Sequence, residues 1–218
     1  MAAVTVRVLV VDDDALVRAA LVMMLDGAQG IAVVAEAADG AEVPAALDLH
    51  PVDVVLMDLR MPRVDGVTAT ARLRARSGAP AVLVLTTFDT DEEILGALRA
   101  GASGYLLKDT PPPRIAEAVR RAAAGEATLS SAVTRRLVEQ AVDHADVADD
   151  ARARLAALTH REREVVAAVG RGLTNAEIAA ELHVSVATVK AQVSHVLAAL
   201  DVGNRTQVAL LAHDAGLV

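Results

Sequence analysis

The first 124 residues alternate short apolar runs with longer amphipathic patterns, and this alternation restricts the fold more than any other feature of the chain. Each apolar run has the length of a strand, and each pattern that follows it repeats as a helix does. Strands alternating with helices predict an α/β fold with a parallel sheet, and right-handed crossovers place the helices on both of its faces. We therefore expect a doubly wound, five-stranded sheet. The predicted strands are Val6–Val11, Ile31–Ala37, Val52–Met57, Ala81–Thr86 and Gly104–Leu107, and the predicted helices are Ala15–Leu25, Ala41–Leu49, Gly66–Arg76, Asp91–Ala100 and Arg114–Ala124.

The last third of the chain carries helical signals only. From Leu155 onward, four N-cap patterns predict a small all-α domain of four helices at residues 155–218. Gly172 and Gly203 are expected to end two of these helices. Residues 1–124 would form the first domain, and residues 125–154 a linker with one helix, Ser131–Val142, and an acidic segment, Asp143–Asp150. The four cap patterns are Thr159-x-x-Glu162, Thr174-x-x-Glu177, Ser185-x-x-Thr188 and Asn204-x-x-Gln207.

Composition excludes several kinds of functional site. The chain of 218 residues has no cysteine, which rules out disulfides, thiolate metal sites and cysteine nucleophiles. Aromatic residues make up 1% of it, too few for a surface on which single-stranded nucleic acid stacks. No apolar stretch approaches the roughly 18 residues of a membrane helix, and no signal-peptide pattern opens the chain. We expect a soluble, cytoplasmic protein with no membrane partner.

Charge is unevenly divided between the two parts. The net charge is −8, but residues 151–218 hold seven Lys/Arg and six Asp/Glu, a balance of +1 that leaves −9 for residues 1–150. The acidity therefore belongs to the first part and says little against a nucleic-acid partner for the second.

Acidic side chains follow two of the predicted strands where each strand ends. Asp12 and Asp13 follow the first strand, and Asp58 follows the third. Because parallel strands bring their carboxyl ends to one edge of a sheet, these carboxylates are expected to meet there. They repel one another unless a cation lies among them, so we predict a Mg²⁺ site, with the backbone carbonyl of Arg60 as a further ligand. Asp14 is better explained as the N-cap of the next helix.

The same edge offers what phosphoryl transfer to an aspartate requires. An aspartate accepts a phosphoryl group when the developing charge is neutralised and the attack is in line. Lys108 ends the fifth strand and would contact the phosphoryl oxygens. Thr86 ends the fourth strand and offers its hydroxyl. Asp58 would complete the metal site and accept the phosphoryl group.

Five motifs follow one another along the first domain, at or near the predicted strand ends. They are Val10-Val11-Asp12-Asp13, Met57-Asp58-Leu59-Arg60-Met61-Pro62, Asp65-Gly66, Leu85-Thr86-Thr87 and Gly101-Ala102-Ser103-Gly104-Tyr105-Leu106-Leu107-Lys108. With these motifs, residues 4–124 resemble the flavodoxin-like receiver domain of bacterial two-component response regulators. The resemblance implies phosphotransfer from a sensor histidine kinase to Asp58, and a switch formed by Thr86 and Tyr105. Many receivers have proline after the lysine, often with a cis bond; Asp109 stands there, so no cis peptide is expected.

A helix, a tight turn and a second helix are predicted at Thr174–Leu182, His183-Val184 and Ser185–Leu200. An apolar stripe on the second helix leaves small and polar residues on the opposite face, which could enter a DNA major groove. Periodicity alone equally allows an ordinary helix in a small bundle. The stripe is Val189, Val193, Val196, Leu197 and Leu200, and the candidate DNA contacts are Thr188, Lys190, Ala191, Gln192 and Ser194.

Five motifs follow one another along the second domain. They are Leu158-Thr159-x-Arg161-Glu162-x-Glu164-Val165, Gly172-Leu173-Thr174-Asn175-x-Glu177-Ile178-Ala179, Ser185-Val186-Ala187-Thr188-Val189-Lys190, Arg205-Thr206-Gln207 and Gly216-Leu217-Val218. With these motifs, residues 155–218 resemble the LuxR-type helix-turn-helix, so the whole chain resembles a response regulator of the NarL/FixJ type. The resemblance implies a dimer contact on Asn204–Ala215, for which the candidates are Asn204, Val208 and Leu211. Gln192 stands where the family usually has histidine, and Ala199 where it often has lysine.

These features predict a transcription factor controlled by phosphorylation of Asp58, with no enzymatic activity beyond slow autodephosphorylation. The active homodimer would bind a two-fold site in double-stranded DNA, since the weak positive charge of the second domain favours doubled contacts. One alternative is a phosphorylation-independent regulator whose receiver only mediates dimers. Another is a hydrolase with an aspartyl-phosphate intermediate, although Arg60 stands where such phosphatases usually carry a general acid.

Overall fold

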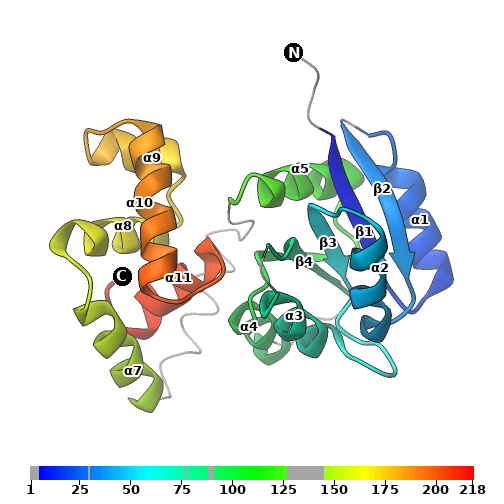
Figure 1. The fold of residues 1–218 in the computed structure, drawn as a ribbon, viewed down its shortest axis with the longest axis horizontal. Coiled ribbons are helices and arrows are strands. Elements are labelled where there is room, and N and C mark those ends of the chain that lie inside the picture. The colour runs from blue at the N-terminus through cyan, green and yellow to red at the C-terminus, as the bar shows by residue number, and fades with distance from the viewer. Residues whose placement is uncertain (1–4, 29, 77, 88–90, 127–144) are drawn as a thin grey trace. The chain divides into compact units, whose positions relative to one another are not determined.

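The computed structural model describes residues 5–28, 30–76, 78–87, 91–126 and 145–218. The chain divides into two compact units, Met1–Thr128 and Leu129–Val218, each with hydrophobic clusters of its own (Figure 1). Among the described residues, no helix is both long enough and apolar enough to cross a membrane.

The first unit is a five-stranded parallel sheet with helices on both faces (Figure 1). The strand order is β2-β1-β3-β4-β5, and all neighbouring strands are parallel, which confirms the doubly wound fold. The strands are β1 Val6–Val11, β2 Ile31–Ala37, β3 Val54–Met57, β4 Ala81–Thr86 and β5 Gly104–Leu107. The helices are α1 Ala15–Leu25, the 3-10 helix η1 Gly40–Glu42, α2 Val43–Leu49, α3 Gly66–Arg74, α4 Asp91–Arg99 and α5 Pro112–Ala123.

Two hydrophobic clusters hold these layers together. Successive residues of a strand point to opposite faces of a sheet. Val8 and Val10 of β1 therefore pack with α1 and α5, whereas Leu9 and Val11 pack with α2 and α3. All residues of β3 are buried. Strands covered on both sides read as continuous apolar runs, which is why they could be recognised in the sequence.

Differences from the predicted elements of this unit are confined to their ends. β3 begins at Val54 instead of Val52, and α5 begins at Pro112 instead of Arg114. Proline fits the first turn of a helix because no N–H is needed there. Gly40–Glu42 is a separate 3-10 turn that Asp39 caps by accepting from the Ala41 N–H. The described residues contain no cis peptide bond, as the Lys108-Asp109 sequence predicted.

The second unit consists, in its described part, of five helices around one core. Helix α7, Ala145–Ala156, includes residues 145–150 of the acidic segment that the sequence, for lack of strong periodicity, predicts as linker. Its Ala151 and Leu155 are buried in the core, so tertiary packing stabilises a helix whose own sequence lacks strong periodicity. The predicted helix Ser131–Val142 lies outside the described residues, as do residues 143 and 144. The helices are α7 Ala145–Ala156, α8 His160–Gly170, α9 Asn175–Glu181, α10 Val186–Ala199 and α11 Arg205–Asp214.

The predicted helix caps of this unit are confirmed with one exception. Thr159, Thr174, Ser185 and Asn204 each accept a backbone N–H at the start of a helix, and the first two form complete capping boxes. Gly172 follows α8 with a φ of 78°. Gly203 does not end α10, because Asp201 takes the left-handed position with a φ of 48°. The N–H of Val202 then bonds to the carbonyl of Leu197, which closes the helix.

Candidate functional site

Three carboxylates meet at the carboxyl edge of the sheet. Val11 of β1 lies beside Met57 of β3, so the residues that follow these strands are neighbours. The Asp58 N–H donates to the Val11 carbonyl at 2.9 Å. Asp12, Asp13 and Asp58 each place a carboxylate oxygen within 4.8 Å of the others. Asp12 is 1% exposed and Asp58 6%, whereas Asp13 faces solvent.

Lys108 follows the edge strand β5, and its side chain reaches the acidic cluster from there. Its N–H donates to the Thr86 carbonyl at 2.9 Å, which joins the ends of β4 and β5. Its ammonium lies 2.6 Å from Asp12 Oδ2 and 3.0 Å from Asp58 Oδ1, and its side chain is 14% exposed. One buried cation is thus shared by two buried carboxylates.

Burial and the hydrogen bonds of Lys108 act in opposite directions on the pKa values of this site. Burial raises the pKa of Asp58, and the hydrogen bond from Lys108 only partly offsets the effect. Burial lowers the pKa of Lys108, but hydrogen bonds to Asp12 and Asp58 outweigh it, so the net pKa is raised. Lys108 therefore stays protonated at neutral pH and is the one ammonium beside three carboxyl groups in the described part of this site.

The cluster fits a divalent cation. Mg²⁺ prefers oxygen ligands and keeps several bound waters, and the three carboxylates at these strand ends supply such ligands. Neighbouring carboxylates also repel one another, and a bound cation would relieve that repulsion. Asp12, Asp13 and Asp58 are the residues that could hold it. Asp14 is the N-cap of α1, as predicted, since its side chain accepts from the N–H groups of Leu16 and Val17.

The loop after Asp58 is fixed by backbone contacts. The Gly66 N–H donates to the Leu59 carbonyl at 2.9 Å. A Cβ at Gly66 would lie 2.1 Å from the Asp58 carbonyl oxygen, so only glycine permits this approach. Asp65 caps α3 by accepting from Thr68. The start of α3 is therefore locked against the backbone of Asp58.

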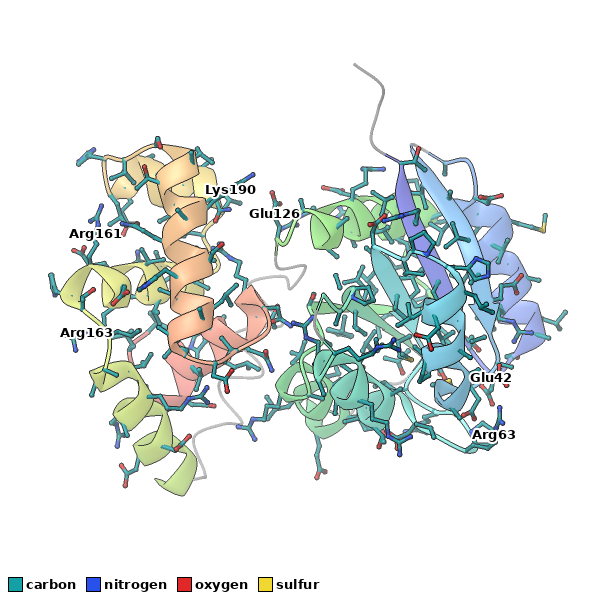
Figure 2. The ribbon with its side chains drawn as sticks, viewed as in Figure 1. Glu42, Arg63, Glu126, Arg161, Arg163 and Lys190 are labelled. Carbon is teal, nitrogen blue, oxygen red and sulfur yellow. The ribbon has the colours of Figure 1, made fainter. Side chains whose placement is uncertain are left out.

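Asp39 holds the far end of the same loop, a role that the sequence analysis missed. It is 1% exposed and accepts backbone N–H groups from Arg63 at 2.9 Å and Val64 at 3.1 Å. The Arg63 guanidinium also pairs with Glu42 at 2.5 Å (Figure 2). The signal in the sequence was the pair Asp39-Gly40, separated by one residue from the end of a strand, which marks a turn but not its contact 25 residues away.

Thr86 and Tyr105 occupy the strands that the prediction gave them. Thr86 is the last residue of β4 and is 2% exposed. Tyr105 lies opposite Val84 on the edge strand β5 and is partly exposed. Their role as a switch stays a prediction.

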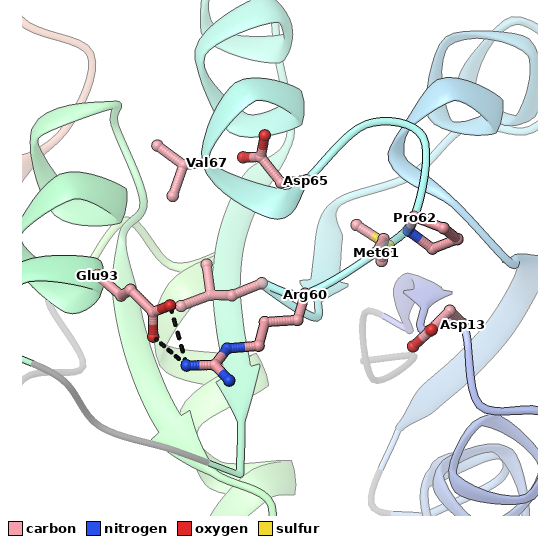
Figure 3. A pocket seen from close by; sticks show the side chains of 8 residues that line it. Asp13, Arg60, Met61, Pro62, Asp65, Val67 and Glu93 are labelled. Atoms are coloured by element: carbon pink, nitrogen blue, oxygen red, sulfur yellow. Dashed lines mark hydrogen bonds and ion pairs between the residues drawn. The ribbon is translucent and has the colours of Figure 1, made fainter.

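An open pocket of about 560 Å³ lies beside the acidic cluster (Figure 3). Asp13 borders it on one side, and the loop after Asp58 forms much of its wall. Arg60 donates its backbone N–H to Asp58 Oδ2 at 3.0 Å. Its guanidinium lies 3.1 Å from Glu93 of α4. The lining residues are Asp13, Leu59, Arg60, Met61, Pro62, Asp65, Val67 and Glu93.

In the second unit, α9 and α10 form a helix-turn-helix around His183, whose φ is 55°. The apolar stripe of α10 faces the core, as predicted, with Val189, Val196 and Leu200 buried. Lys190 is exposed and makes no ion pair with any residue that the structure describes (Figure 2). The other candidate contacts Thr188, Ala191 and Ser194 are exposed as well.

Three candidate residues of this unit are less accessible than we expected. Gln192 is only partly exposed, and its Oε1 is buried. Val208 and Leu211 are 1% and 8% exposed within the hydrophobic core, which leaves little of either side chain for another subunit, and their role in a dimer contact stays a prediction. The apolar face of α11 packs inside its own unit. Asn204 caps α11 by accepting from the Gln207 N–H.

Comparisons with known proteins agree with both units. The response regulator receiver domain matches residues 8–120, and the bacterial regulatory proteins of the luxR family match residues 156–212. The transcriptional regulatory protein LiaR of Bacillus subtilis is 38% identical over 98% of this chain and 99% of LiaR. The response regulator protein VraR of Staphylococcus aureus is 37% identical over 98% of this chain and 99% of VraR.

A crystal structure of the response regulator ChrA, from a heme-sensing two-component system, is similar with a TM-score of 0.53 and 39% identity. That similarity covers 98% of this chain and 99% of ChrA. The fold, the acidic strand ends and the helix-turn-helix thus point to the same family as these matches. The chain belongs to the response regulators of the NarL/FixJ type, in which a receiver domain is followed by a LuxR-type DNA-binding domain.

Proposed function

We propose that Asp58 accepts a phosphoryl group from a phosphohistidine of a sensor histidine kinase, and that this modification controls DNA binding. A carboxylate oxygen of Asp58 attacks the phosphorus. The O–P bond forms as the P–N bond to the imidazole breaks, and the electron pair returns to the ring nitrogen. The observation that carries this proposal is the Lys108 ammonium 3.0 Å from Asp58, within a cluster of three carboxylates.

The residues around Asp58 divide the work of this transfer. Asp12, Asp13 and Asp58, with the backbone carbonyl of Arg60, would hold Mg²⁺, which when bound neutralises charge on the phosphoryl oxygens. Lys108 supplies a fixed positive charge at the same place. The contacts of Gly66 and Asp39 keep the loop from moving as the bond forms. Water can later hydrolyse the acyl phosphate slowly, which is the only turnover we assign to the protein.

Phosphorylation would be read through Thr86 and Tyr105. The Thr86 hydroxyl would turn toward the phosphoryl group, and the Tyr105 ring would move into the space that it leaves. Both residues end or lie on the strands next to the site, β4 and β5, which supports this role. The changed surface of α4, β5 and α5 would then favour a homodimer.

The DNA partner would be double-stranded and would be read by α10. Thr188, Lys190, Ala191 and Ser194 are exposed on this helix, and Gln192 lies at its margin. Two copies on a two-fold site would double these contacts. Because DNA is the partner, we place the protein in the cytoplasm.

One experiment tests the proposal. Wild type and Asp58→Asn are incubated with Mg²⁺ and acetyl phosphate, and both phosphoryl labelling and binding to target DNA are measured. Labelling of wild type alone, with a gain in DNA affinity that the variant lacks, is the expected result. Equal DNA binding by both proteins would instead support a regulator that does not depend on phosphorylation. Sustained turnover of a phosphomonoester would support the hydrolase alternative.

A further inference from the structure

The ion pair between Arg60 and Glu93 joins the phosphoacceptor loop to helix α4 across the pocket (Figure 3). Nη2 of Arg60 lies 3.1 Å from Glu93 Oε1 and 3.2 Å from Oε2. The Arg60 side chain is 59% exposed and the Glu93 side chain 36%. Ion pairs with this much solvent contact contribute little to stability, so the guanidinium can exchange partners at small cost.

Phosphorylation changes the charge that Arg60 experiences. The step replaces the single negative charge of the Asp58 carboxylate by a phosphoryl group with nearly two. Lys108 is already shared between Asp12 and Asp58 and is largely buried. Arg60 is the next cation along the loop, and its backbone N–H is already bonded to the Asp58 carboxylate.

The shape of the site favours the same exchange. A guanidinium is planar and presents pairs of N–H donors that match phosphoryl oxygens. Asp13 and Leu59, the residue after Asp58, line the pocket of about 560 Å³ together with Arg60, so there is open space next to the phosphoacceptor loop. Leu59, Met61 and Val67 of the lining offer the guanidinium no charged partner, and the Asp65 carboxylate already accepts from the N–H and hydroxyl of Thr68. Asp13, the other lining carboxylate, belongs to the proposed Mg²⁺ site.

We propose that Arg60 is a further phosphoryl-contact residue, which Glu93 holds in the resting protein and releases to the phosphoryl group on Asp58. Glu93 and the phosphoryl group then compete for one guanidinium. Phosphorylation therefore breaks the ion pair that connects the phosphoacceptor loop to α4. This inference depends on the proposed role of Asp58 as acceptor.

The test compares labelling of Asp58 by acetyl phosphate, with Mg²⁺, in wild type, Arg60→Gln, Glu93→Gln and the double variant. In this reaction the Asp58 oxygen forms the O–P bond, the bond between phosphorus and the acetyl oxygen breaks, and acetate leaves. Glu93→Gln should raise the labelling rate about three-fold at low salt, and Arg60→Gln should lower it about three-fold, the size expected for exposed charges. The effect of Glu93→Gln should vanish when Arg60 is already Gln, and both effects should shrink at high salt.

Asp48→Asn is the matched control, because Asp48 forms a similarly exposed ion pair with Arg76 at 2.5 Å and does not line the pocket. It should label like wild type. Single variants that also label like wild type, or a Glu93→Gln effect that persists in the double variant, would overturn the role of Arg60 while leaving Asp58 as acceptor. Absence of labelling in wild type itself would instead overturn the proposed function.

Discussion

Replacing Gly66 by alanine should impair phosphoryl transfer far more than folding. The new Cβ would lie 2.1 Å from the Asp58 carbonyl oxygen and 2.9 Å from the Leu59 Cα. Both are backbone atoms, so no side-chain rotation relieves the overlap. Restoring normal contact distances requires a shift of roughly 1 Å between the start of α3 and the Asp58 backbone. Overpacking of this kind costs about 1–3 kcal/mol of unfolding free energy.

The larger effect is on reactivity. A misplacement of about 1 Å near reacting groups lowers rates by roughly 100-fold. The assay measures the initial rate of labelling by acetyl phosphate alongside urea unfolding of the same samples. Gly96→Ala is the control, since no atom lies within 4 Å of a Cβ there and the helix interior gains about 0.5–1 kcal/mol from alanine. Wild-type labelling rates in a folded Gly66→Ala protein would refute the view that this contact positions Asp58.

Three further changes should have measurable consequences, and a fourth tests the charge of the site. Asp53→Asn loses the double hydrogen bond with the Arg7 guanidinium, which holds the Asp53 pKa below its usual value. The unfolding free energy measured with urea at pH 7 should fall by about 0.5–1 kcal/mol. This difference from wild type should shrink as the pH falls below about 4, because the wild-type carboxylate is then protonated as well. Lys190→Ala should weaken DNA binding by about 1–3 kcal/mol in a titration if the side chain reads a base, and nearly equally for all sequences if it contacts phosphate. Asp201→Gly should raise the unfolding free energy by about 0.5–1 kcal/mol, since glycine adopts a φ of 48° without strain; a lower thermal midpoint would contradict this. Asp58→Asn should unfold at a higher temperature than wild type in EDTA at pH 7. The pKa of Asp58 is raised in the folded protein, so its buried carboxylate destabilises wild type above that pKa. The destabilisation disappears toward about pH 4, where the unfolding temperatures of the two proteins should converge.

The parts of the fold that could be predicted are those in which one local signal decides. Strands buried on both faces are continuous apolar runs, and the strand ends then bring Asp12 and Asp58 together through topology alone. Residues 145–150 of helix α7 were not predicted as helical, because the helix is stabilised by the packing of Leu155 in a core that the local sequence does not reveal. The same limit applies to α11, where periodicity marks an apolar face but not whether Val208 meets its own core or another subunit.

Contacts between distant loops were equally hidden. The Arg60–Glu93 pair depends on how α4 lies against the phosphoacceptor loop, which no spacing in the chain encodes. The bond from Asp39 to Val64 crosses 25 residues and likewise follows only from the packed sheet. The pairs Asp39-Gly40 and Asp65-Gly66 are turn signals, but the partners of the side chains in these loops required the structure.

Asp39 and Asp58 are both buried, but they differ in what surrounds their carboxylates. At Asp39, burial raises the pKa, but N–H groups of Ala41, Arg63 and Val64 outweigh it and the net pKa is lowered. At Asp58 burial wins, although Lys108 stands beside it. A carboxylate that its surroundings stabilise less is more basic and a better nucleophile. The desolvation that makes Asp58 costly for folding therefore favours its attack on phosphorus, whereas Asp39, with its oxygens fully engaged, is suited to holding the loop and not to reacting.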